Sequence, residues 1–262
     1  MRKVVIVLVV LVGLLVATDF GVAASAEYRV SQQLRDEFSL TTDPSVHITG
    51  FPFLTQAAAG RYDEIEVVAT GVNVGPLTEV AVEATLSDVD APLSELMSGS
   101  LDSVQADAVD GRVRVHDTDL GRAIGIEDLR LQHASDEEVE EALGSGTVSK
   151  SDSDALAAVR MVATTDLVGV RTEVIVIALL ELTERVVRVT PTDVRLATDE
   201  VGEVSLPEAI REPILSAFTT QVDPGGLPFT VTPTAVYVET GSLIVEGTAQ
   251  DVMFRQAGTG VG

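Results

Sequence analysis

The chain has 262 residues, 45% of them hydrophobic, which suffices for one large domain or two small ones. Its 41 acidic residues and 17 basic residues give a net charge of −24. This charge argues against nucleic acid as a partner and against binding to anionic membrane through clustered basic residues. The lack of cysteine excludes disulfides, thiolate zinc sites, cysteine nucleophiles and the acylated cysteine of a lipoprotein.

The chain starts with the pattern of an export signal. Two basic residues precede an unbroken apolar run over 4–17, and 24–26 supply small residues at the spacing of a signal cleavage site. The run is shorter than the roughly 20 residues of a typical membrane span. We therefore expect 1–26 to be a signal peptide or an uncleaved membrane anchor, with cleavage after Ala26 favoured. In both cases the domain is exported to the cell envelope or periplasmic space, secreted or anchored.

An amphipathic helix is predicted over 27–40. Val30, Leu34 and Phe38 recur every four residues on one face, and the polar residues lie elsewhere. This spacing is compatible with a helix docked on an ordinary core, and also with one that lines a lipid cavity or rests on a membrane. The sequence leaves these alternatives open.

The stretch 50–72 combines an apolar corner with a one-sided strand. Phe51, Phe53 and Leu54 surround a proline that fixes the backbone where large apolar side chains are offered. The second half of the stretch alternates between apolar and polar residues, which predicts a strand with one buried face. Another alternating segment, 78–86, predicts an antiparallel partner for it.

Shorter elements are predicted in the middle of the chain. Asp110-Gly111 is a hairpin-turn signal between two predicted strands, 103–109 and 112–116. A capping box at 135–138 predicts the start of a helix, whose acidic first turn we interpret as a solvated helix terminus and not as a metal site.

Three long strands are predicted next, over 155–164, 168–182 and 185–196. The second strand is apolar at every position of 174–180, so we expect it to be covered on both faces or to meet lipid on one. Pro191 lacks the N–H group for a ladder hydrogen bond, which predicts a sheet edge or a bulge at that residue.

A second amphipathic helix is predicted to begin at a capping box over 205–208. Ile210, Ile214 and Phe218 follow at intervals of four residues, and Pro213 is expected to bend the helix.

The chain is predicted to end in a hairpin, with strands over 228–239 and 242–252. A disordered tail is expected over 257–262.

No catalytic constellation stands out in the sequence. The three histidines lie near no G-x-S-x-G elbow, since the sequence contains none, and Asp117 and Asp119 lack the spacing of a calcium loop. We therefore expect no enzyme, no cofactor and no metal. An enzyme with an uncommon carboxylate-based site and a structural or adaptor protein of the envelope remain as alternatives.

Several segments resemble one known family. GFPFLTQ at 50–56, followed by AGRYDEIEV at 59–67, is similar to the hallmark of the actinobacterial LmeA-like phospholipid-binding family. The likeness extends from about residue 30 to residue 254 and is weakest over 93–153. Further matching pieces are Val189-Thr190-Pro191, Leu206-Pro207, Leu227-Pro228-Phe229 and the run over 241–247.

The resemblance implies a non-enzymatic, phospholipid-binding domain over 27–256 that supports the maintenance of envelope lipids and lipoglycans. It also implies a fold similar to one half of the tubular lipid-binding (TULIP) proteins: α+β, with a long, strongly curved antiparallel sheet wrapped around amphipathic helices. The residues by themselves support a sheet-rich domain with two amphipathic helices. The partners implied are a phospholipid or related acyl lipid and the cell membrane; the oligomeric state stays open.

Apolar side chains of the corner, of the two helices and of the last hairpin are the candidates for lipid contact. Our hypothesis is that the corner and the second helix approach each other and that part of each lines the lipid site; the alternative is that both belong to an ordinary core. The candidate lipid-binding residues are Phe51, Phe53, Leu54, Val30, Leu34, Phe38, Ile210, Ile214, Phe218 and Phe229.

Overall fold

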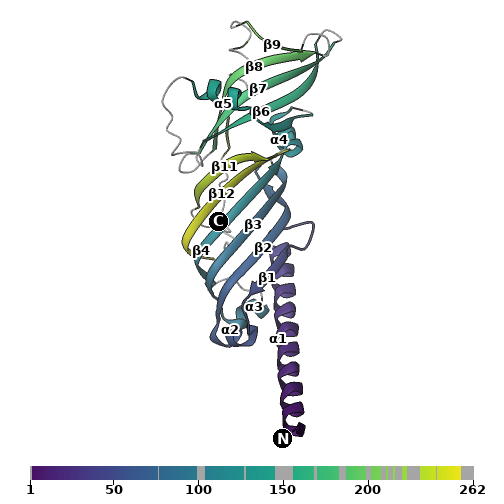
Figure 1. Ribbon diagram of the computed structural model, residues 1–262, viewed down its shortest axis with the longest axis vertical. Helices are drawn as coiled ribbons and strands as arrows, with labels where there is room; N and C mark the ends of the chain where they lie inside the picture. The colour runs from purple at the N-terminus through teal and green to yellow at the C-terminus, as the bar shows by residue number, and fades with distance from the viewer. Residues whose placement is uncertain are drawn as a thin grey trace, which may run out of the picture.

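Two antiparallel sheets, stacked end to end along the long axis, make up most of the structure, and one long helix projects from the lower end (Figure 1). This confirms the expected α+β class, although the strands divide between two sheets; the likeness to half a TULIP protein stays a prediction. The computed structural model describes residues 2–75, 77–98, 104–126, 128–144, 156–167, 170–182, 187–198, 202–207, 211, 215, 220–222, 231–239 and 241–254.

The first sheet has six strands in the order β1-β2-β3-β4-β12-β11. Every neighbouring pair is antiparallel, so the predicted pairing of 62–72 with 78–86 is confirmed as β2 with β3. The strands are β1 (Ser45–Thr49), β2 (Arg61–Val74), β3 (Leu77–Asp90), β4 (Gln105–His116), β12 (Ser242–Met253) and β11 (Thr232–Glu239).

The second sheet has the order β10-β8-β7-β6-β5, and β9 pairs with β8 beside this path. Its three central strands are the three long strands that the sequence predicts. The strands are β10 (Thr220–Val222), β8 (Val187–Thr198), β7 (Val170–Leu182), β6 (Leu156–Leu167), β5 (Arg130–His133) and β9 (Gly202–Ser205).

Four of the described helices lie at the ends and edges of the sheets, and α5 packs on one face of the second sheet. This helix starts at the predicted capping box: the Ser135 side chain accepts the N–H of Glu138, and the Glu138 carboxylate accepts the N–H of Ser135. The helices are α1 (Arg2–Glu37), α2 (Phe53–Ala59), α3 (Leu93–Ser98), α4 (Asp117–Ile124) and α5 (Asp136–Leu143).

The predicted turn at Asp110-Gly111 is wrong, because both residues lie within β4. Gly111 pairs with Ala84 on one side and with Gly247 on the other. Hydrogen bonding to two neighbouring strands holds the chain extended here, and a glycine in a central strand is tolerated where other backbones pack closely. Tertiary pairing therefore outweighs the local turn signal of the Asp-Gly dipeptide.

Pro191 lies at a bulge, as predicted. The pairing of β7 with β8 passes from Ile177–Asp193 to Ala178–Pro191, which leaves Thr192 as the extra residue. The Thr192 hydroxyl donates to the carbonyl of Ile177 at 3.2 Å. The bulge thus accommodates a residue that cannot donate to the ladder.

Four adjacent strands of the first sheet interrupt their two-residue alternation at the same level, and we call this level the crease. The pairing of β2 with β3 passes from Glu64–Ser87 to Tyr62–Val89 and skips the two residues between. The same gap recurs between β3 and β4 and between β4 and β12, so inward side chains on either side of the crease are three residues apart. The skipped residues are Asp63, Asp88, Asp107 and Asp251, of which Asp88 and Asp251 have positive φ, a conformation that aspartate tolerates.

Two buried clusters lie on the same face of the first sheet, which we call the inner face. The joint cluster fills the contact between the two sheets and includes Val80, Val115, Val159 and Met161. The base cluster fills the opposite end, where α1, α2 and the crease meet. Its buried residues are Ala26, Val46, Ile48, Phe53, Ala57, Tyr62, Ile65, Val89, Ala91, Val104, Ala106, Val109, Ala249 and Val252.

The strand β7 is covered on both faces, which confirms one of the two predicted alternatives. Val176 and Leu180 belong to the joint cluster on one face. Ile175 and Ile177 lie on the other face, where Ala142 of α5 packs against them. Its continuous apolar sequence therefore reflects burial on both sides.

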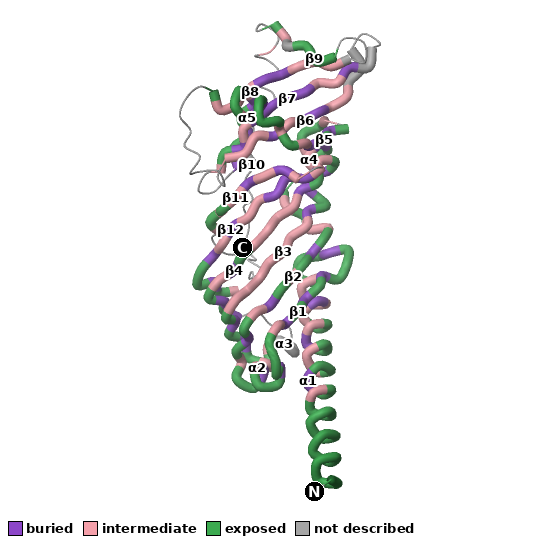
Figure 2. Tube along the Cα trace, in the orientation of Figure 1, coloured by how far each residue is buried: buried purple, intermediate pink, exposed green. Residues whose placement is uncertain are grey.

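One continuous helix replaces the separate apolar and amphipathic segments predicted at the N-terminus. The first half of α1 has exposed side chains, and the second half packs against the base cluster (Figure 2). The helix ends at Glu37, so Phe38, predicted on its apolar face, lies just beyond it and is exposed.

Candidate functional site

The second half of α1 is fastened to the domain by Asp19. This carboxylate is only 4% exposed and accepts the backbone N–H groups of Phe53 at 2.9 Å and Leu54 at 2.7 Å. These are the first N–H groups of α2, whose own N-cap residue, Pro52, makes no side-chain cap. Asp19 therefore caps α2 from a different helix, and its negative charge is favoured at a helix N-terminus.

Further contacts follow along the same half of α1. Glu27 accepts the backbone N–H of Ile48 at 2.9 Å, and the Ser31 hydroxyl donates to the carbonyl of Pro44 at 2.6 Å. Ala26, the residue that precedes the predicted cleavage point, is fully buried in the base cluster. The helix from Asp19 onward is thus an integral part of the folded domain.

The apolar corner divides its aromatic residues between core and surface. Phe53, 2% exposed, lies 6.0 Å from Tyr62 between ring centroids, inside the base cluster. Phe51 is 62% exposed and stacks at 6.0 Å on Phe20 of α1, which is 63% exposed. The corner therefore supplies one aromatic group to the packed interior and presents another beside the helix.

The base cluster contains one buried polar group of note, the hydroxyl of Tyr62. Its hydroxyl is buried and has no hydrogen-bond partner among the described residues. Burial raises the pKa of Tyr62, because the phenolate form is disfavoured away from water. The hydroxyl therefore costs stability without contributing a bond.

The structure places some of the predicted site residues, and others lie outside the described residues. Val30 and Leu34 are half-buried against the base cluster, and Leu54 is partly exposed. Leu206, which precedes the predicted second stripe, and Leu215, which lies within its span, pack against the joint cluster and not against the base cluster. Four predicted residues, Ile210, Ile214, Phe218 and Phe229, lie outside the described residues, so the approach of the corner to the second helix stays a prediction.

Between the two filled clusters, the inner face carries apolar side chains that are only half-buried. Four neighbouring strands contribute them, and two glycines, Gly111 and Gly247, lie paired at the centre of the same face. At ~4.8 Å per strand spacing, the four strands span about 14 Å. We call this surface the inner strip; its members are Val67, Val82, Ala84, Leu86, Val113 and Val245.

Charged residues of the same strands lie on the outer face. Arg112 donates to Glu246 at 2.9 Å, and the Tyr237 hydroxyl donates to the same carboxylate at 2.7 Å. The Tyr237 and Arg112 hydrogen bonds lower the pKa of Glu246, against the effect of its burial. A hollow of about 330 Å³ lies here, lined by Glu83, Thr85, Asp110, Gly111, Arg112, Thr234, Glu246, Gly247 and Thr248; its polar walls do not suit an acyl chain.

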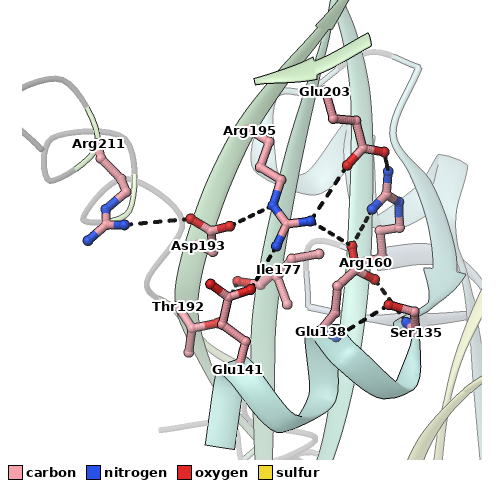
Figure 3. Close-up of polar contacts among 10 residues, drawn as sticks. All are labelled: Ser135, Glu138, Glu141, Arg160, Ile177, Thr192, Asp193, Arg195, Glu203 and Arg211. Atoms are coloured by element: carbon pink, nitrogen blue, oxygen red, sulfur yellow. Dashed lines mark hydrogen bonds and ion pairs between the residues drawn. The ribbon is translucent and has the colours of Figure 1, made fainter. Parts of the chain in front are cut away.

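A charged network covers the face of the second sheet under α5 (Figure 3). Arg195 contacts Asp193 at 2.8 Å and Glu141 of α5 at 2.9 Å. Arg160, mostly buried, contacts Glu138 of α5 and Glu203 of β9. Each of these four carboxylates contacts at least one arginine, so the network fastens α5 and β9 to the sheet.

Glu138 is the most buried acid of this network. Burial alone would raise the pKa of Glu138, but the hydrogen bonds from Ser135 and the charge of Arg160 outweigh it and lower the pKa. A carboxylate held ionised by two structural partners is suited to stabilise the fold and not to exchange protons.

Metal-ligand geometry is missing from the part of the chain that the structure describes. No group of three or more histidine, aspartate or glutamate side chains is placed there to hold an ion. Asp119 is buried, and its sequence context lacks the spacing of a calcium loop. Its carboxylate accepts a hydrogen bond from the backbone N–H of Thr78 at 3.0 Å and one from the Arg122 side chain at 2.8 Å. It therefore joins α4 to the start of β3.

Asp19 is the residue of this region that the sequence analysis missed. It lies two residues after the apolar run over 4–17, where a charged residue is expected simply to end the hydrophobic segment. A charge five residues before a small-residue cleavage pattern gives no sign that it caps a helix over thirty residues later. The inner strip was partly predicted, because the alternation in β2 and β3 indicates one apolar face.

One comparison with known proteins identifies the family of this chain. The searches of curated proteins and of solved structures each found no match. A sequence model of one family, described as LmeA-like phospholipid-binding, matches residues 17–248, which covers most of the chain. The chain therefore belongs to the LmeA-like phospholipid-binding family.

Proposed function

We propose that this protein is a non-enzymatic phospholipid-binding protein of the cell envelope that holds acyl chains against the inner strip. One observation carries the proposal: a continuous apolar surface on four strands stays half-buried, while the clusters at both of its ends are filled. The charges of the same strands lie on the opposite face. This separation leaves hydrocarbon as the fitting ligand for the inner face.

Hydrocarbon needs no catalytic group to bind such a surface. Each CH₂ removed from water contributes about 0.8 kcal/mol, so ten buried methylenes contribute on the order of 8 kcal/mol before the costs of ordering the chain. That magnitude corresponds to roughly micromolar affinity. A modest apolar strip is therefore sufficient for a lipid carrier or sensor.

The candidate residues enter the proposal in different roles. Val30 and Leu34 border the lipid, because they are half-buried beside the inner face. Phe53 supports the end of the strip from within the base cluster. Ile210, Ile214, Phe218 and Phe229 are kept as predicted lipid contacts from the second helix and the last hairpin.

The role in envelope lipid and lipoglycan maintenance rests on the family resemblance. We also propose that the protein is located in the envelope and that it forms one lipid-binding domain. The location is supported by α1, the one described helix that is long and apolar enough to cross a membrane. A structural or adaptor protein of the envelope without bound lipid is the alternative function.

Native mass spectrometry of protein purified from its own membrane fraction tests the proposal. We expect a co-purified lipid on the unmodified protein. Val82→Thr combined with Val113→Thr places two hydroxyl groups on cross-strand neighbours of the inner strip, where they cost binding energy against hydrocarbon. The matched control is Val68→Thr on the exposed outer side of β2.

The double variant should lose most of the lipid, several-fold relative to both the unmodified protein and the control. Unmodified protein that carries no lipid at all would support the adaptor function instead. Equal lipid on the double variant and on the control would remove the inner strip from the site.

A further inference from the structure

The exposed half of α1 has the dimensions of a membrane span. From Arg2 to Asp19 the helix rises about 26 Å at 1.5 Å per residue, close to the ~30 Å of a bilayer's hydrocarbon. Its large side chains in this half, from Val4 to Leu15, are all exposed. Two basic residues flank its outer end, Arg2 and Lys3, as expected for the cytoplasmic side of a span.

The other end of this span lies at the base of the domain. Figure 1 shows α1 leaving the first sheet beside α2 and continuing away from it. Asp19 is the residue at which the helix becomes buried, since it caps α2 through the N–H groups of Phe53 and Leu54. A bilayer around the exposed half would thus have its surface at the level of Phe20.

Exposed apolar groups surround the helix at that level. Phe20 and Phe51 stack on each other and are each more than 60% exposed, and Leu54, on the first turn of α2, is also exposed. The sequence of α2, FLTQAAA, carries no charge, in a chain whose net charge is −24. The surface formed by α2 with Phe20 and Phe51 is uncharged and aromatic, which suits a lipid surface, and the exposed ion pair of Arg61 with Asp90 lies beside it at the ends of β2 and β3.

We propose that α1 is retained as a membrane anchor and that the base of the domain, formed by Phe20, Phe51 and Leu54, contacts the bilayer. Cleavage after Ala26 would remove the carboxylate that caps α2 and a fully buried residue of the base cluster. Retention keeps both. The rigid link through Asp19 then holds the first sheet upright on the membrane, with the second sheet farthest from it. The inference stands independently of the proposed acyl site.

The mass of the membrane-extracted protein tests retention. The intact mass of protein extracted with detergent from its producing cells should correspond to a chain that includes residues 2–26. A chain that begins at Glu27 would overturn the proposal. A soluble pool of the shorter chain in place of the membrane-bound one would do the same.

Single tryptophans test the contact, because the chain contains none. Phe51→Trp and, separately, Leu54→Trp place one fluorophore at the base. The matched control is Val204→Trp, an exposed apolar position on β9 in the second sheet. The full chain is reconstituted into phosphatidylcholine vesicles that contain a lipid with a quencher near its head group.

We expect the two base positions to be quenched several-fold more strongly than Val204→Trp. Having two base reporters keeps the result interpretable when one substitution disturbs the fold. Quenching at the base no stronger than at the control position would overturn the contact. It would show that α1 carries the domain clear of the bilayer or lets it lie along the surface.

Discussion

The base cluster and the inner strip are built from similar side chains on the same face of one sheet, but they are buried to different degrees. In the base cluster, α1, α2 and the crease close over the sheet and leave side chains such as Phe53 and Tyr62 fully covered. In the inner strip, four valines, Ala84 and Leu86 of the same strands stay half-buried. The apolar surface of the base cluster is buried and stabilises the fold, whereas the apolar surface of the inner strip stays partly uncovered.

Truncation should distinguish the two regions most strongly. Phe53→Ala removes a fully buried ring from the base cluster, and we expect it to lower the free energy of unfolding by about 3–5 kcal/mol. Val113→Ala in the inner strip should lower it by only about 1 kcal/mol, since two half-exposed methyl groups are lost. Urea unfolding of lipid-free protein in detergent measures both; equal costs would erase the distinction.

Removing the cap that α1 provides should have the next largest effect on the free energy of unfolding. Asp19→Ala leaves the first N–H groups of α2 without their acceptor, and we expect a loss of about 1–2 kcal/mol in the free energy of unfolding. Asp43→Ala is the control, because the ion pair of Asp43 with Arg35 is exposed. This substitution should cost less than ~0.5 kcal/mol. A neutral Asp19→Ala would show that α2 does not need the cap from α1.

A change in the opposite direction is expected inside the base cluster. Tyr62→Phe keeps the ring and removes a buried hydroxyl that has no partner among the described residues, so the free energy of unfolding should rise by up to about 1 kcal/mol. Thermal unfolding of the variant beside the unmodified protein is sufficient. Destabilisation would mean that the hydroxyl makes a bond and that this cluster is less dry than its burial indicates.

Salt is expected to have the smallest effect. With a net charge of −24, the protein gains no attraction from an anionic lipid surface, and the inner strip carries no charged side chain. Lipid affinity should therefore hardly change between low and physiological salt, or rise slightly as repulsion is screened. Titration of a dispersed phospholipid onto delipidated protein across a salt series measures this, because vesicles would also bind the apolar half of α1. A steep loss of binding would favour an electrostatic site such as the polar hollow on the outer face.

Much of the fold was predictable because β2 and β3 alternate between apolar and polar residues over most of their length. The alternation indicated these two strands and their pairing, and the long apolar run of β7 indicated a third strand. The local signal at Asp110-Gly111 misled, since a dipeptide typical of turns is also accommodated in a strand that is paired on both sides.

The candidate site was predictable only in part. Alternation identifies an apolar face, but it does not tell a filled cluster from a half-buried strip, because that depends on which helices cover the face. The role of Asp19 depends on a contact 34 residues away along the chain. Likewise the crease depends on four aspartates that meet only when β2, β3, β4 and β12 are paired.

The dependence of affinity on acyl length tests most directly whether hydrocarbon binds to the inner strip. Phospholipids with one head group and chains of increasing length are titrated onto delipidated protein. We predict that each added CH₂ strengthens binding, by up to about fourfold at ~0.8 kcal/mol, until the strip is covered. The double variant Val82→Thr with Val113→Thr should show a weaker dependence than Val68→Thr. An affinity that follows the head group and ignores chain length would contradict the account.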